Sequence, residues 1–302
     1  MPIVSLVNVQ PQSIGSLPAV GPLAFGLWRY TDPDVAAAQC LLETALDAGM
    51  NLVDTADVYG LDWGGSGFGS VEEILGSVLA VAPGLRDRMV LATKGGILPP
   101  VPYDSSPEYL RRACEDSLRR MKTDVIDLYQ IHRPDLFTHP ADVAAELTAL
   151  RDDGKIREVG VSNHTPPQVA ALAAHLPFPL ASSQFEYSAL HLDPLRDGTF
   201  DDCMRNARAP LAWSPLAGGR LATGDGVRPE LLAVIDSLAD REGVDRATIA
   251  IAFVLAHPAR PVAIVGSQTA ERIVAGTAAF DVELSRHDVY SIVQASEGVP
   301  LP

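Results

Sequence analysis

The chain has 302 residues, 47% of them apolar and 20% charged, which is the composition of an ordinary globular protein. Its 38 acidic residues exceed its 23 Lys and Arg, and the net charge of −15 opposes binding to nucleic acids or anionic membranes. Cys40, Cys114 and Cys203 lie far apart without C-x-x-C spacing, which argues against disulfides or structural zinc. No segment is typical of a signal peptide or a membrane span. We therefore expect a cytoplasmic protein with no metal site and no obligate protein partner.

Eight short apolar runs rich in β-branched residues are predicted to be strands: Leu23–Leu27, Asn51–Asp54, Met89–Thr93, Val125–Ile131, Glu158–Val161, Ala181–Phe185, Leu211–Trp213 and Val262–Val265. Segments with helical spacing separate them, and the longest interval holds two expected helices around Pro229–Arg241 and Arg246–His257. Apolar strands that alternate with helices predict a parallel sheet buried on both faces. Eight such units predict a single-domain α/β protein, a (β/α)8 TIM barrel. Residues 1–20 are expected to form a lead-in or a short hairpin at the barrel bottom.

Polar residues stand where three successive strands end, and this is where barrel enzymes build their active sites. Asp54 ends the second strand, Lys94 the third and His132 the fourth, and Tyr59 follows the second strand in its loop. Because adjacent strands lie about 4.8 Å apart, these side chains can converge without long loops. Each residue alone is equally well explained as a helix cap, a solvated charge or part of a loop. Together, at the ends of successive strands, they predict an active site.

This group of side chains is suited to proton transfer at a carbonyl. A tyrosine phenol is a poor acid at neutral pH, and a nearby ammonium lowers its pKa. We expect Lys94 to do this for Tyr59, Asp54 to hold Lys94 charged, and His132 to hydrogen-bond the carbonyl oxygen. Tyr59 is therefore predicted to be a general acid.

The chain resembles the aldo-keto reductase superfamily over nearly its whole length. The resemblance is carried by Asp54-Thr55-Ala56 with Tyr59-Gly60, by Thr93-Lys94, by the run from Asp127 to His132, and by Gly160–Asn163, in the family's order and spacing. It implies a barrel enzyme that reduces aldehydes or ketones, or oxidises the matching alcohols, with a nicotinamide cofactor. It also implies that Asp54, Tyr59, Lys94 and His132 form the catalytic tetrad.

The resemblance places the cofactor across the ends of strands five to eight. It assigns the nicotinamide carboxamide to Ser162, Asn163 and Gln184, and ring stacking to Trp213. It assigns binding of the pyrophosphate to the loop that contains Ser214, Pro215, Leu216, Gly218 and Arg220. It assigns binding of the adenosine ribose and its 2′-phosphate to Gly266, Ser267, Gln268 and Arg272.

Arg272 at the phosphate position implies a preference for NADP (NADPH) over NAD. Departures from the family pattern leave NAD as an alternative, because Gly266 replaces a basic residue and Ala275-Gly276 replace a Glu-Asn pair. Trp28 and His164 are candidates for the wall of the substrate pocket.

The sequence thus predicts an NADP(H)-preferring oxidoreductase that reduces the carbonyl of a small molecule, with Tyr59 as the proton donor. One alternative is an NAD(P)-dependent dehydrogenase that oxidises a sugar or a pyridoxal-like substrate. Another is a regulatory subunit that binds the cofactor to sense redox state. The glycine-rich segment 64–70 lacks the G-x-G-x-x-G pattern of a dinucleotide-binding turn, so we expect it to be a loop beside Tyr59.

Overall fold

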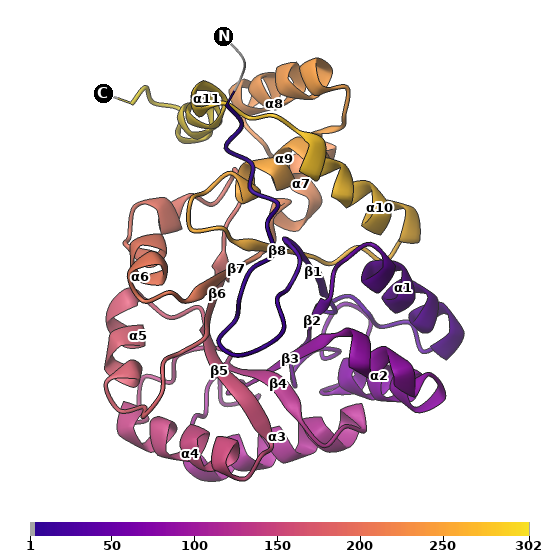
Figure 1. The fold of residues 1–302 in the computed structure, drawn as a ribbon, viewed down its shortest axis with the longest axis vertical. Helices are drawn as coiled ribbons and strands as arrows, with labels where there is room; N and C mark the ends of the chain where they lie inside the picture. The colour runs from indigo at the N-terminus through magenta and orange to yellow at the C-terminus, as the bar shows by residue number, and fades with distance from the viewer. Residues whose placement is uncertain (1–3, 302) are drawn as a thin grey trace.

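Eight parallel strands close into a barrel in the computed structural model, which describes residues 4–301 (Figure 1). Every strand pairs with the next along the chain, and the last pairs with the first. The strands are β1 Leu23–Gly26, β2 Leu52–Asp54, β3 Val90–Gly95, β4 Ile126–Ile131, β5 Ile156–Ser162, β6 Ser182–Glu186, β7 Ala209–Trp213 and β8 Val262–Val265. The predicted single-domain (β/α)8 barrel is confirmed, and the expected strand ends differ from these by at most two residues.

Helices surround the barrel in Figure 1. The α-helices are α1 Val35–Asp47, α2 Ser70–Val81, α3 Pro107–Met121, α4 Pro140–Asp152, α5 Pro166–Ala173, α6 Thr199–Arg205, α7 Arg220–Thr223, α8 Pro229–Glu242, α9 Arg246–Leu255, α10 Ala270–Ala275 and α11 Arg286–Glu297. Short 3₁₀ helices are η1 Pro83–Arg88, η2 Asp193–Leu195, η3 Ala217–Gly219 and η4 Gly276–Asp281. The two helices expected before the last strand are α8 and α9, and α9 ends two residues earlier than predicted. In the described part of the chain, no helix is long and apolar enough to cross a membrane.

Side-chain caps fix where helices begin. Ser106 precedes Pro107, and its hydroxyl accepts a hydrogen bond of 3.4 Å from the backbone N–H of Tyr109 at the start of α3. At the start of α5, Thr165 and Gln168 form a capping box, with the backbone N–H of Thr165 donating to Gln168 Oε1 at 2.9 Å. Such caps satisfy backbone N–H groups that have no partner inside the helix. They set the helix starts, and so the lengths of the loops that follow the strands.

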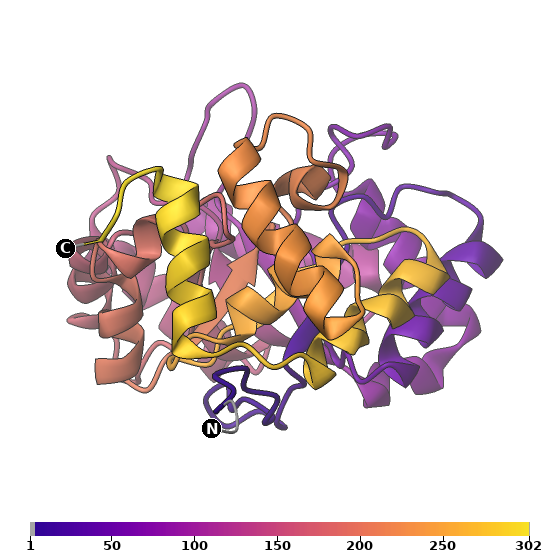
Figure 2. The same cartoon turned by 90° about the horizontal axis from the view of Figure 1, so that it is seen from above.

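An apolar segment before β1 fills one end of the barrel. Gln12 and Val20 form an antiparallel bridge, and the side chains of Ile14, Leu17 and Val20 pack against the inward-facing residues of the strands. Figure 2 shows this N-terminal segment below the ring of helices. Residues 1–3 of the expected lead-in lie outside the described residues. The barrel interior is therefore packed with apolar side chains beneath the strand ends that carry the polar residues.

We expect Ile14→Ala to lower the free energy of unfolding by about 2–5 kcal/mol, because Ile14 is fully buried and the truncation leaves a cavity. Denaturation by urea measures the change. Val9→Ala, in the same segment but 36% exposed, is the matched control and should change stability by less than about 0.5 kcal/mol. Equal losses in the two variants would contradict the proposed packing.

Candidate active site

A fully buried lysine is the centre of the polar cluster at the carboxyl ends of the strands. Lys94, on β3, has no exposed side-chain surface and lies 2.7 Å from Asp54 Oδ2 on β2. Its Nζ also donates to the Thr55 carbonyl at 2.8 Å and to the Tyr59 hydroxyl at 3.3 Å. An ammonium has three N–H donors, so these three acceptors satisfy it completely. The structure thus brings together Asp54, Lys94 and Tyr59 as the sequence predicted.

The second oxygen of Asp54 is held by two amides from the opposite side of the barrel. Gln184 Nε2, on β6, donates to Asp54 Oδ1 at 2.9 Å, and Gln130 Nε2, on β4, donates at 3.3 Å. Gln130 Oε1 accepts from the Ser182 hydroxyl at 3.3 Å. Gln130 is not among the site residues predicted from the sequence, although its place two residues before His132 puts both side chains on the same face of the strand. Asp54 is therefore fixed by three strands besides its own.

Burial determines the protonation state of Tyr59. Burial raises the pKa of the phenol, and the opposing effect of the Lys94 ammonium does not cancel it. Lys94 acts in the predicted direction, but the expected net lowering of this pKa is wrong because the effect of burial is larger. Burial acts to lower the pKa of Lys94, but Asp54 and Tyr59 act more strongly and raise it. At neutral pH Tyr59 thus carries its proton and Lys94 its charge.

His132 completes the cluster from the end of β4. Its ring lies edge-on to the Tyr59 ring, with centroids 5.8 Å apart and planes at 78°, and its backbone N–H donates to the Gly95 carbonyl at 2.8 Å. Burial, and then the positive charges of Lys94 and Arg133, lower its pKa well below the usual value. The imidazole is therefore neutral at physiological pH and has a single N–H to donate. Its Nδ1 is buried without a hydrogen-bond partner among residues 4–301.

The residues assigned to the nicotinamide lie together beside this cluster. Asn163 Nδ2 donates to the His132 carbonyl at 3.1 Å and to the Ser162 hydroxyl at 2.8 Å. Trp213 Nε1 donates to Asn163 Oδ1 at 3.1 Å, which fixes the indole at the end of β7. Asn163 has a φ of +59°, a left-handed conformation that asparagine tolerates better than most residues. Gln184, also assigned here, donates from Nε2 to Asp54 Oδ1.

The residues assigned to the phosphates lie on the loops after β7 and β8. Ser214 Oγ accepts from the Gly218 N–H at 3.0 Å, and Arg220 Nε donates to the Ala217 carbonyl at 3.1 Å. Pro215 and Leu216 belong to the same turn. After β8, hydrogen bonds between neighbours shape the loop that contains Gly266, Ser267 and Gln268, and Arg272 is exposed on α10.

The two candidates for the pocket wall come from different loops. His164 Nδ1 lies 2.8 Å from the Ser162 carbonyl, and burial lowers the pKa of the ring to about 4. Trp28 follows β1, is 38% exposed, and donates from Nε1 to Asp62 Oδ1 at 3.2 Å. His164 is thus a neutral, fixed ring, and Trp28 offers an open apolar surface.

The residues present fit a nicotinamide dinucleotide. A fixed, half-buried indole stands beside the tetrad, and the Gly218 φ of +73° lets the backbone of the following loop turn tightly. Arg220 and Arg272 are positively charged side chains that could pair with phosphates, on a chain whose net charge is −15. Within residues 4–301, no group of three or more His, Cys, Asp or Glu side chains is arranged to hold a metal ion.

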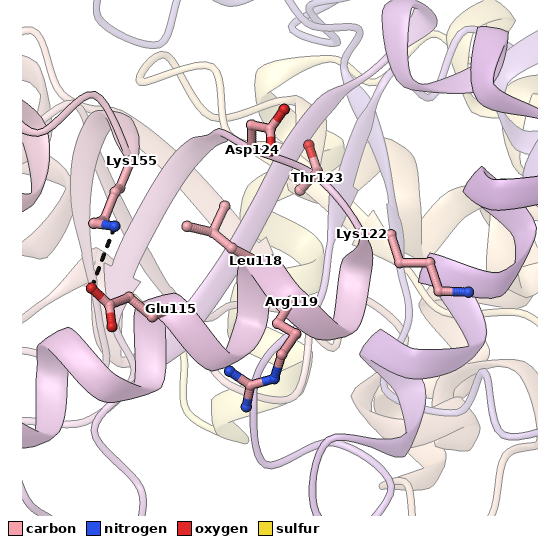
Figure 3. A pocket seen from close by; sticks show the side chains of 7 residues that line it. All are labelled: Glu115, Leu118, Arg119, Lys122, Thr123, Asp124 and Lys155. Atoms are coloured by element: carbon pink, nitrogen blue, oxygen red, sulfur yellow. Dashed lines mark ion pairs between the residues drawn. The ribbon is translucent and has the colours of Figure 1, made fainter.

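A surface hollow of about 570 Å³ lies elsewhere on the molecule (Figure 3). Its walls come from the end of α3 and from the segments before β4 and β5, namely Glu115, Leu118, Arg119, Lys122, Thr123, Asp124 and Lys155. Lys155 and Glu115 form an ion pair of 3.3 Å across it. The hollow is thus at the amino ends of the strands, away from the tetrad, and contains none of the predicted site residues.

Comparison with known proteins agrees with this geometry. The family model described as "Aldo/keto reductase family" matches residues 22–297. The chain is 49% identical over 287 residues to a 6-dehydroglucose reductase of Novosphingobium aromaticivorans, covering 94% of each chain, and 33% identical to one of Agrobacterium fabrum, covering 91% of this chain and 94% of the relative. A solved glycerol dehydrogenase from Gluconobacter oxydans superposes with a TM-score of 0.82 at 27% identity, over 99% of this chain and 98% of that one. The chain therefore belongs to the aldo/keto reductase family, whose members are oxidoreductases that use nicotinamide cofactors, as the resemblance implied.

Proposed function

We propose that this enzyme is an NADP(H)-preferring reductase that converts a sugar aldehyde of the 6-dehydroglucose kind to its alcohol. The observation that carries the proposal is the series of hydrogen bonds from the buried Asp54 and Lys94 to the half-buried Tyr59, beside a neutral His132. The names of the two relatives support an aldehyde on a sugar as the substrate. The substrate is in any case a small molecule, as expected for this family.

In this proposal each member of the tetrad has its own task. The nicotinamide, when bound, supplies a hydride to the carbonyl carbon. The neutral imidazole of His132 donates its N–H to the carbonyl oxygen and orients it. Tyr59 gives its phenolic proton to that oxygen as the hydride arrives, and Lys94 stabilises the phenolate left behind. Asp54 keeps Lys94 charged, and a proton from water restores the phenol.

Other residues of the chain hold the cofactor in this proposal. Ser162 and Asn163 face the carboxamide, with Gln184 nearby, and Trp213 stacks on the ring. Arg272 is exposed on α10 and pairs with the 2′-phosphate, which is the only chemical difference between NADP and NAD. The loop that contains Arg220 receives the pyrophosphate.

The reverse reaction is the second candidate. The structural likeness to a glycerol dehydrogenase favours a role in alcohol oxidation. Oxidation needs Tyr59 to accept a proton, so it must begin from the phenolate. Because the pKa of Tyr59 is raised, the phenol is protonated at neutral pH, which is the state that reduction requires.

We expect Tyr59→Phe to lower kcat for aldehyde reduction by about 10²- to 10⁴-fold, because it removes the proton donor and leaves the ring. NADPH consumption measures activity, and NADPH binding should be unchanged. Tyr290→Phe, an exposed tyrosine on α11, is the matched control. Full activity in Tyr59→Phe would remove the proposed mechanism.

The pH dependence of the two directions should differ. The raised pKa of Tyr59 and the lowered pKa of His132 leave both groups neutral between about pH 6 and about pH 8, so kcat/KM for reduction should be flat there. Oxidation should accelerate as the pH rises, because the phenolate becomes more abundant. Steady-state rates in both directions provide the measurement. An acidic limb near neutral pH that disappears in His132→Gln would show that the imidazole titrates in this range.

Arg272→Ala should raise the Kd of NADPH by roughly tenfold and that of NADH by less than about twofold, because only NADPH has the phosphate. Fluorescence titration of the cofactor measures both constants. Arg286→Ala, on α11, removes another exposed arginine and serves as the control. Equal affinity for the two cofactors, unaffected by Arg272→Ala, would refute the assignment of the phosphate.

A further inference from the structure

Two exposed tryptophans lie against each other at the mouth of the barrel. Trp28, in the loop after β1, is 38% exposed, and Trp63, in the loop after β2, is 54% exposed. Their ring centroids are 5.2 Å apart and their planes meet at 75°. Trp63 follows Tyr59 by four residues, so this aromatic surface belongs to the same loop as the proposed proton donor. Exposed aromatic side chains that contact each other on the loops around a candidate active site are typical of a ligand-binding site.

Charged and polar groups frame the two indoles. The Arg29 guanidinium lies 4.3 Å from the centroid of the Trp63 ring and 5.8 Å from that of Trp28. On the other loop, Asp62 Oδ1 accepts the Trp28 indole N–H at 3.2 Å. Thr31 also donates from its hydroxyl to the Trp63 carbonyl at 3.3 Å, which ties the two loops together. We call Trp28, Arg29, Asp62 and Trp63 the tryptophan platform.

The backbone at Trp63 is unusual for such a residue. Its φ is +55°, in the left-handed region that bulky side chains seldom adopt. The side chain is mostly exposed, so burial in the core does not explain the conformation. Strained backbone of this kind is concentrated at functional sites, where it aims a side chain that would otherwise point elsewhere. At Trp63 the strained conformation accompanies an indole that contacts Trp28 and Arg29.

We propose that the tryptophan platform is the subsite that binds the sugar ring of the substrate, an inference that rests on the proposed function. The C–H faces of a sugar ring are apolar and stack on indoles, and its hydroxyls bond to carboxylates and guanidinium groups. One cation and one anion on the platform give no net charge, so a neutral monosaccharide fits it better than a phosphorylated or an amino sugar.

The chemistry of the substrate class agrees with this position. In a hexose with an aldehyde at C6, the ring can stay closed, because the ring oxygen bonds to C5 and the aldehyde stands outside the ring. The reacting carbon is then one bond away from the ring. A ring held on the loop just beyond Tyr59 would direct the aldehyde towards the phenol, whereas a small aliphatic aldehyde would make no contact with the platform.

The test compares a sugar aldehyde with a small aldehyde. In Trp63→Ala, KM for 6-dehydroglucose should rise about tenfold, while KM for propanal changes much less and kcat for both falls little. Trp63→Phe keeps an aromatic face and should recover most of the affinity for the sugar. Tyr290→Ala, which removes an exposed aromatic side chain from α11, is the control. Equal changes in KM for both substrates, or no change for either, would overturn the assignment and leave the proposed function intact.

A binding measurement separates this inference from the proposed function. Saturation-transfer NMR detects D-glucose on the wild-type enzyme without turnover, and we expect the transfer to the sugar ring protons to be lost in Trp63→Ala. Transfer that depends on Trp63, in an enzyme that does not reduce 6-dehydroglucose, would support the platform and refute the proposed function. Absence of transfer in the wild type would refute the platform.

Discussion

The ammonium of Lys94, buried without any exposed surface, is the constraint on which the polar end of this barrel depends. A charge removed from water costs several kcal/mol unless the surrounding groups compensate for it. Here the compensation comes from Asp54, the Thr55 carbonyl and the Tyr59 hydroxyl, and Asp54 in turn is held by Gln130 and Gln184. Lys94, Asp54, Gln130 and Gln184 lie on β3, β2, β4 and β6, and Thr55 and Tyr59 lie in the loop after β2. Closure of the barrel brings these groups together. The apolar layers beneath them keep water out.

Burial at this site shifts the pKa values of Tyr59 and His132, the two groups proposed to face the substrate, in opposite directions. It raises the pKa of Tyr59 and lowers that of His132, because in each case it disfavours the charged form. The result is two neutral hydrogen-bond donors beside a compensated ion pair. A carbonyl oxygen is a neutral acceptor that becomes more negative as hydride arrives, so this arrangement stabilises the developing charge without first binding an anion. The net charge of −15 is no obstacle to such a substrate.

Most of the fold, and the proximity of the four residues of the proposed tetrad, could be predicted because both follow from local pattern. Apolar runs mark the strands, and polar residues at strand ends mark the site, which is how Lys94 and His132 were found. The link from Gln130 to Asp54 crosses the barrel, so it depends on closure and not on any local pattern. The pKa of Tyr59 depends on how burial competes with the lysine, and a sequence gives no measure of that balance. The left-handed backbone of Trp63 lies in a loop, where no periodicity applies.

The tetrad and the tryptophan platform share the junction between β1 and β2 but are held by different bonds. Strand pairing places Gly26 beside Asp54, and the Leu27 N–H donates to the Asp54 carbonyl at 2.9 Å. Leu27 immediately precedes Trp28, so the same junction positions Asp54 of the proposed tetrad and the Trp28 indole of the platform. The carboxylate of Asp54, however, is fixed by β3, β4 and β6, none of which contributes to the platform. A substitution at Trp28 or Trp63 can therefore alter which carbonyl compound is held while the buried ion pair of Asp54 and Lys94 stays in place.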